Sequence, residues 1–285
     1  MRFTLLIFLW FVSTAAIDNA SYAGGVAIVP LYGVSSEQPP IAFMEDRRIR
    51  VEVLPSGEWA AIVGIALGAK PKETKYIGYH TIEGKTAITS FRIGEKSYPT
   101  QRLTIDARME ALDEKTIARV VKERQIVKEA IAKFSEDFRG DLQMSLPLVA
   151  PISSRFGLRR IINKTPRNPH GGTDLAAPKN TPIKAPSSGY VALFGEHFYC
   201  GRFVLLNHAE GLFTLYCHLE KHNVSDGKRV KAGDVIGYVG ATGRVTGAHL
   251  HWSAALNGAW FDPLLLVDSE DLAKLTPRSP TPQKR

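Results

Sequence analysis

Short runs of β-prone residues separated by turn residues fill the chain from residue 24 to about residue 110. Glycine and proline interrupt the pattern between these runs, for example at Pro55-Ser56-Gly57. Short apolar runs bounded by such residues are typical of all-β folds. We therefore expect a small β-sandwich-like domain over residues 24–110, with strands at residues 26–31, 48–54, 59–67 and 86–93.

The hydrophobic period changes after Asp113. From there to Phe134 the apolar residues recur at the spacing of a helix that has one apolar face, and Asp113 is a suitable N-cap. The opposite face carries Lys and Glu side chains and is expected to face solvent, while the apolar stripe should pack on a flanking domain. Residues 111–148 are thus predicted to be a helix and a linker. The stripe consists of Ile117, Val120, Val121, Val127, Ile131 and Phe134.

The pattern of strands and glycine-rich turns returns over residues 149–267. Strands are expected at residues 189–194, 203–207, 212–219 and 235–239. The remaining residues, 268–285, end in a polar, proline-containing and basic stretch, which predicts a disordered tail. The pattern as a whole predicts a mostly β protein with two β-rich domains joined by an amphipathic helix.

The composition is that of an ordinary globular protein. Among 285 residues, 44% are hydrophobic, 22% are charged and only two are cysteines, which excludes a collagen-like repeat and a disulfide-dense miniprotein. The net charge of +8 favours contact with an acidic polymer, such as a cell wall, a nucleic acid or an anionic membrane surface. Charge alone does not choose among these partners.

The N-terminus has the features of a secretory signal peptide. A short basic start is followed by an apolar run, residues 3–12, that is too short for a stable membrane anchor. Ser21 and Ala23 supply the small residues of a cleavage site, so residues 1–23 are predicted to be removed. The alternatives are an uncleaved anchor and a buried N-terminal helix.

Export would place the two cysteines in an oxidising compartment. Cys200 and Cys217 lie in segments predicted to be neighbouring strands, so a disulfide between them is geometrically possible. Two buried thiols are the alternative. Their spacing is neither that of a zinc knuckle nor that of a redox CxxC motif.

Histidines concentrate in the second β-rich segment, which holds seven of the eight. His170 and Asp174 are separated by a flexible Gly-Gly pair, so both side chains could reach one metal ion. His249 and His251 would face the same side of a strand, because alternate residues share a face. His218 follows Tyr216 and Cys217 near the predicted end of another strand.

These residue types match the needs of a zinc peptidase. A catalytic zinc takes three protein ligands and activates a water molecule, and further groups must move a proton and stabilise the developing oxyanion. Two histidines with one carboxylate, plus two further histidines, supply this set. Residue types and spacing alone leave open both a metal site and a chance arrangement, since isolated H-x-H and H-x-x-x-D patterns are common.

Three motifs together resemble the signature of the lysostaphin-type (LytM) zinc metallopeptidases. The longest is the run from Gly240 to His251, GATGRVTGAHLH, and the others are His170-Gly-Gly-Thr-Asp174 and Tyr216-Cys-His218-Leu219. The matching register continues in SRFGLR, residues 154–159, and in KAGDVIG, residues 231–237. The resemblance covers residues 149–267.

The resemblance implies a zinc-dependent endopeptidase that cuts peptide cross-links in bacterial peptidoglycan. By it, His170, Asp174 and His251 would bind one Zn2+ ion per chain. His218 and His249 would serve as general base or acid and as stabiliser of the tetrahedral intermediate, without a choice between them. The implied fold is an antiparallel β domain with a narrow groove for a peptide that contains Gly or D-Ala. Cys200 and Cys217 depart from the usual pattern, which favours a disulfide special to a subgroup.

The first domain resembles, more weakly, the N-terminal domain of exported proteobacterial members, through residues 59–65 and 98–103. We expect residues 24–140 to position or restrain the peptidase. A rival reading is a non-catalytic regulator that activates cell-wall amidases, but such relatives have lost ligands that this chain retains. Nucleic-acid binding is disfavoured because no reader motif is present. The signal peptide without a lipobox favours a Gram-negative periplasm, with secretion as the alternative. A regulatory protein partner stays open, and the sequence does not identify one.

Overall fold

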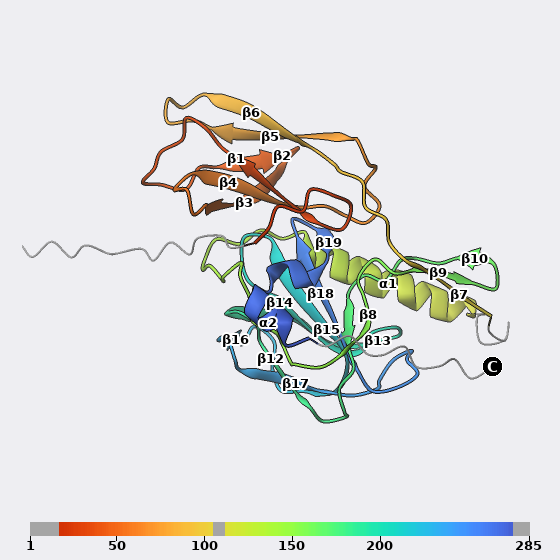
Figure 1. The fold of residues 1–285 in the computed structure, drawn as a ribbon. Coiled ribbons are helices and arrows are strands. Elements are labelled where there is room, and N and C mark those ends of the chain that lie inside the picture. Colours follow the sequence, from red (N-terminus) through yellow and green to blue (C-terminus); the bar gives the residue numbers. More distant parts are fainter. Residues whose placement is uncertain (1–16, 105–111, 276–285) are drawn as a thin grey trace, which may run out of the picture.

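In the computed structural model, which describes residues 17–104 and 112–275, two β assemblies are joined by a long helix (Figure 1). The N-terminal assembly is one antiparallel sheet in the order β1-β4-β3-β2-β5-β6. Its two halves share a single core, which includes Val29 and Val63 from one half and Ile77 from the other. Its strands are β1 (Val26–Pro30), β2 (Ala42–Met44), β3 (Arg47–Val53), β4 (Trp59–Gly64), β5 (Thr74–His80) and β6 (Thr86–Arg92).

Two of these strands, β2 and β5, are absent from the sequence-based expectation. In β5 only Ile77 and Tyr79 are buried, and Gly78 interrupts the run, so the local pattern is weak. The four expected strands are present with ends shifted by a few residues.

Residues 17–23 pack against this domain, and the predicted cleavage after residue 23 stays a prediction. Ala20 N donates to Val26 O at 2.8 Å, Gly94 N donates to Ser21 O at 2.6 Å, and Tyr98 Oη donates to Ala23 O at 2.7 Å. The small-residue pattern that suggested cleavage does not report what packs against those residues. Residues 1–16 lie outside the described part of the chain.

Helix α1 (Glu114–Ile131) begins at the expected N-cap, where Asp113 accepts a hydrogen bond from Thr116 N at 2.7 Å. Of the apolar stripe, Val120 and Ile131 are buried, and Ile131 packs together with Ala130 on the C-terminal sheet. Near the other end Ile117 and Val121 are exposed, at 49% and 60%. The prediction of a fully packed stripe was therefore half right.

The segment expected to be a plain linker contributes to the core. Leu142, Met144, Leu146 and Leu148 are all buried, and Met144 N donates to Leu266 O at 2.7 Å. Buried and exposed residues alternate along this segment, although most of it pairs with no strand. Its buried side chains pack between the two domains and against the C-terminal end of the described chain.

A second antiparallel sheet dominates the C-terminal domain, in the order β16-β13-β14-β15-β18-β11-β8, with β12, β17 and β19 attached to it. Its core includes Leu206, Tyr216 and Trp252, all fully buried. The strands are β8 (Ile152–Ser154), β11 (Thr173–Leu175), β12 (Pro182–Lys184), β13 (Gly189–His197), β14 (Gly201–Asn207), β15 (Leu212–His222), β16 (Arg229–Val230), β17 (Val235–Val239), β18 (Leu250–Leu256) and β19 (Ala259–Phe261).

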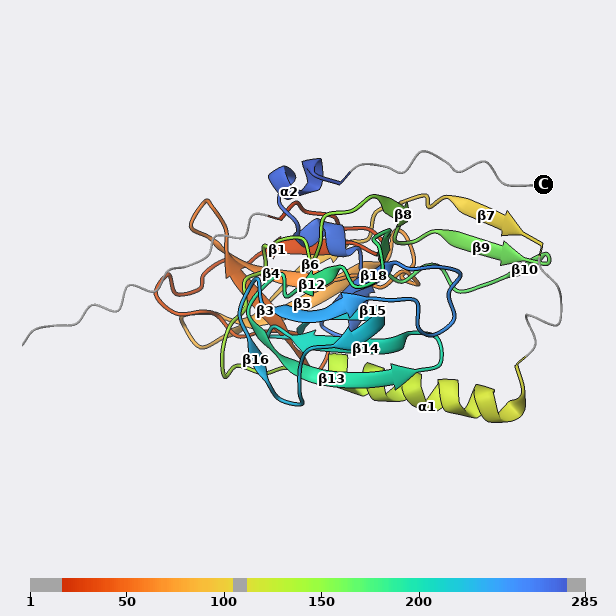
Figure 2. The ribbon, with the colours of Figure 1, turned by 90° about the horizontal axis from the view of Figure 1, so that it is seen from below.

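A three-stranded arm projects beyond the end of this sheet. Strand β7 (Thr100–Leu103) pairs in parallel with β9 (Arg159–Ile162), which pairs with β10 (Thr165–Pro166). Figure 2 shows this arm and helix α1 on opposite sides of the C-terminal sheet. Strands β9 and β10 form a hairpin within this arm, turned at residues 163–164.

The chain closes with a 3-10 helix, Pro263–Leu266, and helix α2 (Ser269–Ala273). Leu272 and Leu275 pack against the C-terminal core, so the predicted disordered tail does not begin at residue 268. The sequence pattern did not predict this contact, because only two apolar side chains in a polar segment make it. Residues 276–285 lie outside the described part of the chain. Among the described helices, none is long and apolar enough to cross a membrane.

Candidate metal centre

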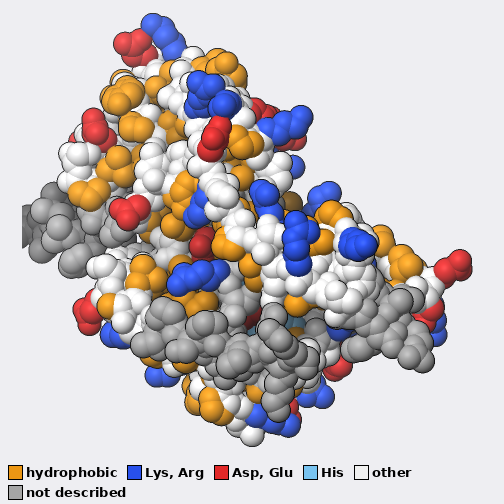
Figure 3. Space-filling view, turned by 45° about the vertical axis from the view of Figure 1, so that its right-hand side comes forward, with side chains coloured by type: hydrophobic (Ala, Val, Ile, Leu, Met, Phe, Trp, Pro, Cys, Tyr) orange, Lys and Arg blue, Asp and Glu red, His pale blue; other side chains and the backbone are white. Residues whose placement is uncertain are grey.

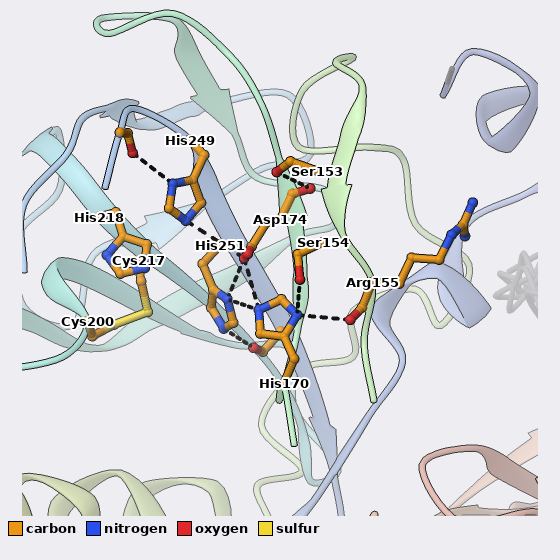
Figure 4. A network of polar contacts seen from close by, with 12 residues as sticks. Ser153, Ser154, Arg155, His170, Asp174, Cys200, Cys217, His218, His249 and His251 are labelled. Carbon is orange, nitrogen blue, oxygen red and sulfur yellow. Dashed lines mark hydrogen bonds and ion pairs between the residues drawn. A yellow bond between two sulfur atoms is a disulfide. The ribbon is translucent and has the colours of Figure 1, made fainter. Parts of the chain in front are cut away.

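Three side chains from the predicted ligand set meet at one point of the C-terminal sheet (Figure 4). Asp174 in β11 stands opposite His251 in β18, and His170 lies just before β11. His251 Nδ1 is 2.8 Å from Asp174 Oδ1 and 3.0 Å from His170 Nε2, and His170 Nε2 is 3.1 Å from Asp174 Oδ1. The exposed side-chain fractions are only 8% for His170, 11% for Asp174 and 17% for His251.

The geometry and chemistry of these atoms fit a metal ion. Ligands of a tetrahedral zinc at about 2.0–2.1 Å lie about 3.3 Å apart, close to the observed separations. His170 Nδ1 donates to Arg155 O at 2.9 Å, so in the neutral ring Nε2 carries a lone pair. That lone pair faces a carboxylate oxygen with no proton of its own, and a cation satisfies both.

Further contacts orient the candidate ligands, as neighbours of metal ligands commonly do. Ser154 Oγ lies 3.2 Å from His170 Nδ1, beside the Arg155 carbonyl. Ser253 Oγ lies 2.9 Å from His251 Nε2, which leaves His251 Nδ1 directed at the other two ligands. Each ring is therefore held at the nitrogen that points away from the centre.

The protonation states also suit ligation at neutral pH. Burial raises the pKa of Asp174, but the adjacent His170 and His251 rings outweigh it and hold this pKa well below its usual range. Burial lowers the pKa of His251, against the opposing effect of Asp174. The carboxylate is thus charged and the His251 imidazole neutral, so both have lone pairs available.

The other two candidate residues, His218 and His249, lie beside this group. Their ring centroids are 4.8 Å apart, and His249 Nε2 is 3.9 Å from Asp174 Oδ1. His218 Nδ1 donates to Thr242 O at 3.0 Å and His249 Nδ1 donates to Gly247 O at 2.9 Å. Both rings therefore keep Nε2 available. Burial, and then the nearby His251 and His249, lower the pKa of His218 to about 4.

The sequence analysis placed His218 near the end of a strand, and this prediction is wrong. His218 lies in the middle of β15 with a φ of 64°, in the left-handed region that non-glycine residues rarely adopt. Cys217, the preceding residue, stands opposite His251 and forms a disulfide with Cys200. Strained backbone of this kind persists only where the surrounding structure holds it.

A cavity of about 610 Å³ extends from the metal centre toward helix α1. His251 and Ser253 lie at one side, Leu215 and Trp260 contribute apolar surface, and Val120 and Val127 of α1 form part of the opposite wall. Figure 3 shows a histidine side chain in a recess near the middle of the molecule, with Lys and Arg side chains on the surface around it. The helix is thus part of the groove.

Sequence reasoning assigned no role to Ser253, Thr242 or helix α1 at this site. Ser253 could have been found, because it follows His251 by two residues in a strand and must share its face. Thr242 lies in the recognised GATGR motif, but only the fold shows that its carbonyl accepts from His218. His197, on which no prediction was based, lines the cavity.

Comparison with known proteins agrees with this architecture. The family model described as Peptidase family M23 matches residues 168–263, and the model of the Peptidase family M23 N-terminal domain matches residues 19–96. The second match begins before residue 23, in agreement with the folded residues 17–23. A crystal structure of a Pseudomonas aeruginosa protein assigned to peptidase M23 has a TM-score of 0.72 and 33% identity, over 87% of this chain and 95% of that chain.

Curated relatives match the C-terminal domain. DD-carboxypeptidase/endopeptidase Mpg of Neisseria meningitidis serogroup B is 42% identical over 119 residues, which are 41% of this chain and 27% of that protein. Peptidoglycan DD-endopeptidase ShyA of Vibrio cholerae is 43% identical over 108 residues, 38% of this chain and 25% of that protein. The aligned part of the chain spans about a quarter of the length of these relatives.

Proposed function

This chain belongs to peptidase family M23, and we propose that it is a zinc-dependent endopeptidase that hydrolyses peptide cross-links of bacterial peptidoglycan. The observation that carries the proposal is the convergence of His170 Nε2, Asp174 Oδ1 and His251 Nδ1 within about 3 Å of one another. The substrate class is suggested by the relatives named as peptidoglycan endopeptidases.

His170, Asp174 and His251 would hold the zinc ion. When bound, zinc supplies Lewis acidity that polarises the scissile carbonyl and activates a water molecule. The two imidazoles and one carboxylate contribute a single negative charge, so a divalent ion there keeps a net positive charge. The contacts with Arg155 and Ser253 fix the ring orientations before substrate arrives.

His218 and His249 would move the proton and stabilise charge. Because each donates its Nδ1 proton to a backbone carbonyl, each presents Nε2 as the group that can accept or return a proton. One histidine takes the proton of the attacking water and returns it to the leaving amine. The other, when protonated, stabilises the oxyanion of the tetrahedral intermediate.

We also propose that the N-terminal region, through α1, positions the peptide rather than restraining the enzyme. Val120 and Val127 line the same cavity as His251, so the helix offers apolar contact to a substrate in the groove. Replacing Val120 with Ala should then raise KM. An increase in kcat without a rise in KM would indicate restraint instead.

Export to the periplasm follows from the same proposal, because the substrate lies outside the cytoplasm. The rival function, a non-catalytic activator of cell-wall amidases, is disfavoured because the candidate ligands and both neighbouring histidines are present and close together.

The test is hydrolysis of purified cross-linked muropeptide dimers by the exported form of the chain, followed by chromatography and mass spectrometry. The proposal predicts monomers whose masses report one added water, loss of this product with His251→Ala, and full activity with His222→Ala. His222 is the matched control because it packs on Phe194, outside the metal centre. Stoichiometric zinc without cleavage would overturn the endopeptidase and favour the regulatory role.

A further inference from the structure

We propose that a disulfide-anchored turn, made of Tyr199, Cys200 and Gly201, acts with Thr242 to position His218 for catalysis. We call this segment the Cys200 turn. The inference rests on the proposed function, because it assigns these residues a part in the same reaction. It goes further in stating what holds His218 in place and in making activity depend on the disulfide.

The backbone of His218 needs an external support. Its φ of 64° places it at an irregularity where two residues of β15, Cys217 and His218, face one residue of β14, Phe203. His218 N donates to Cys200 O at 2.7 Å, and the Cys200–Cys217 disulfide joins the two strands at the same point. The Cys200 turn thus holds the backbone on which the imidazole is mounted.

The imidazole is fixed through Thr242. His218 Nδ1 donates to Thr242 O at 3.0 Å. The Thr242 hydroxyl donates to Leu219 O at 2.8 Å and accepts from Arg202 N at 2.9 Å. Leu219 follows His218 and Arg202 follows the Cys200 turn, so one threonine ties the ring, its strand and the turn together.

The Cys200 turn also packs directly on the loop that contains Thr242. Gly201 has a φ of 60°, and a Cβ there would lie 2.3 Å from the carbonyl carbon of Thr242, so another residue would displace the loop. Arg244 N donates to Tyr199 O at 3.2 Å. Displacement of the turn would therefore move the Thr242 carbonyl, which accepts the hydrogen bond from His218 Nδ1.

Helix α1 holds the turn from its other side, where Glu123 Oε2 accepts from Phe198 N at 2.9 Å. The candidate metal ligands are in or next to other strands, β11 and β18. Figure 4 shows the disulfide beside His218 and away from the side of the metal centre occupied by His170. Loss of the disulfide should therefore disturb His218 while the metal ligands stay together.

The test compares the double variant Cys200→Ala with Cys217→Ala, and Thr242→Val, with the wild type on muropeptide dimers. Each should lower kcat by about 10–100-fold, the effect known for contacts that orient metal ligands, which we expect here for a contact that orients His218. KM and zinc content should not change. Thr242→Ser keeps the hydroxyl and should restore kcat, and Thr246→Val, at an exposed site in the same loop, is the matched control. A reductant should lower wild-type kcat but leave the double variant unaffected.

Wild-type kcat in the double variant and in Thr242→Val would overturn the inference. Loss of zinc or of the folded state in both would also overturn it, because the role would then be general support. If the wild type hydrolyses nothing, the proposed function fails, and ¹⁵N NMR of the histidines tests the positioning alone. The inference predicts an Nδ1-protonated His218 in the wild type and a mixture of tautomers in Thr242→Val; identical spectra would contradict it.

Discussion

The two domains bury polar side chains in opposite ways. In the N-terminal sheet, Arg50 and Glu52 are 1% and 3% exposed and form an ion pair at 2.6 Å. Arg139 from the connecting segment binds the other carboxylate oxygen of Glu52 at 2.7 Å, and Arg50 Nη2 donates to Gly140 O at 2.8 Å. Positive charges here meet negative charges and backbone acceptors.

At the candidate metal centre of the C-terminal sheet, no cationic side chain balances the buried carboxylate. His170 Nε2, Asp174 Oδ1 and His251 Nδ1 meet with one negative charge and no cationic side chain among them. Buried polar groups require partners in either case. The comparison shows that the first cluster is a joint between domains whose charges are paired within the protein, while the second brings together three side-chain atoms that could hold an added cation.

Replacement of His251 should give the largest effect. His251→Ala removes one of three ligands, so we expect the zinc content to fall to background and hydrolysis to decrease by more than about 10³-fold. The variant should still be folded and show a cooperative thermal unfolding transition. Unchanged zinc content would contradict the account, because zinc would then be held without His251.

Replacement of His249 separates proton transfer from ligation. His249→Ala should lower kcat by about 10²–10⁴-fold, the range for loss of a general acid or base. Zinc content should stay at one per chain, since His249 Nε2 is 3.9 Å from Asp174 and outside the ligand group. Loss of zinc together with activity would show that His249 is a ligand.

Replacement of Glu52 in the joint between domains should lower the stability of the protein but leave its catalytic activity unchanged. Glu52→Ala leaves the buried Arg50 without its carboxylate partner at 2.6 Å and with only Glu210 Oε2, 3.6 Å away, which should lower the free energy of unfolding by up to about 3–5 kcal/mol. Denaturant unfolding measures this, and kcat and zinc content should remain unchanged in the folded protein. Glu83→Ala, which breaks an exposed pair with Lys85, is the control expected to unfold as the wild type does.

A buried histidine outside the metal centre predicts a smaller, pH-dependent effect. Burial lowers the pKa of His208 to about 4, from an ordinary value of 6.5. The unfolded chain therefore binds this proton first, and the contribution to stability is present above about pH 6.5 and lost as the pH falls toward 4. The loss should reach about 3 kcal/mol in the free energy of unfolding, and His208→Gln should flatten this part of the profile. An equally steep profile in that variant would assign the dependence to other groups.

The sequence was informative where local pattern and chemistry coincide. Strands β13 to β15 could be predicted because their sequences are strongly apolar. The grouping of His170, Asp174 and His251 could be predicted because the motifs that contain them are specific. Strand β5 and helix α2 could not, since few of their side chains are buried. The left-handed His218 and the wall formed by α1 depend on partners distant in sequence, which no local period encodes. The contacts of residues 17–23 with the N-terminal domain show the same limit.

The most direct test of the account is the position of zinc itself. Crystals of the exported protein grown with zinc would be measured with X-rays on both sides of the zinc absorption edge. The account predicts one anomalous peak per chain, within about 2.0–2.2 Å of His170 Nε2, Asp174 Oδ1 and His251 Nδ1. A peak at other residues, or none between these three, would contradict the claim that this cluster is a metal centre.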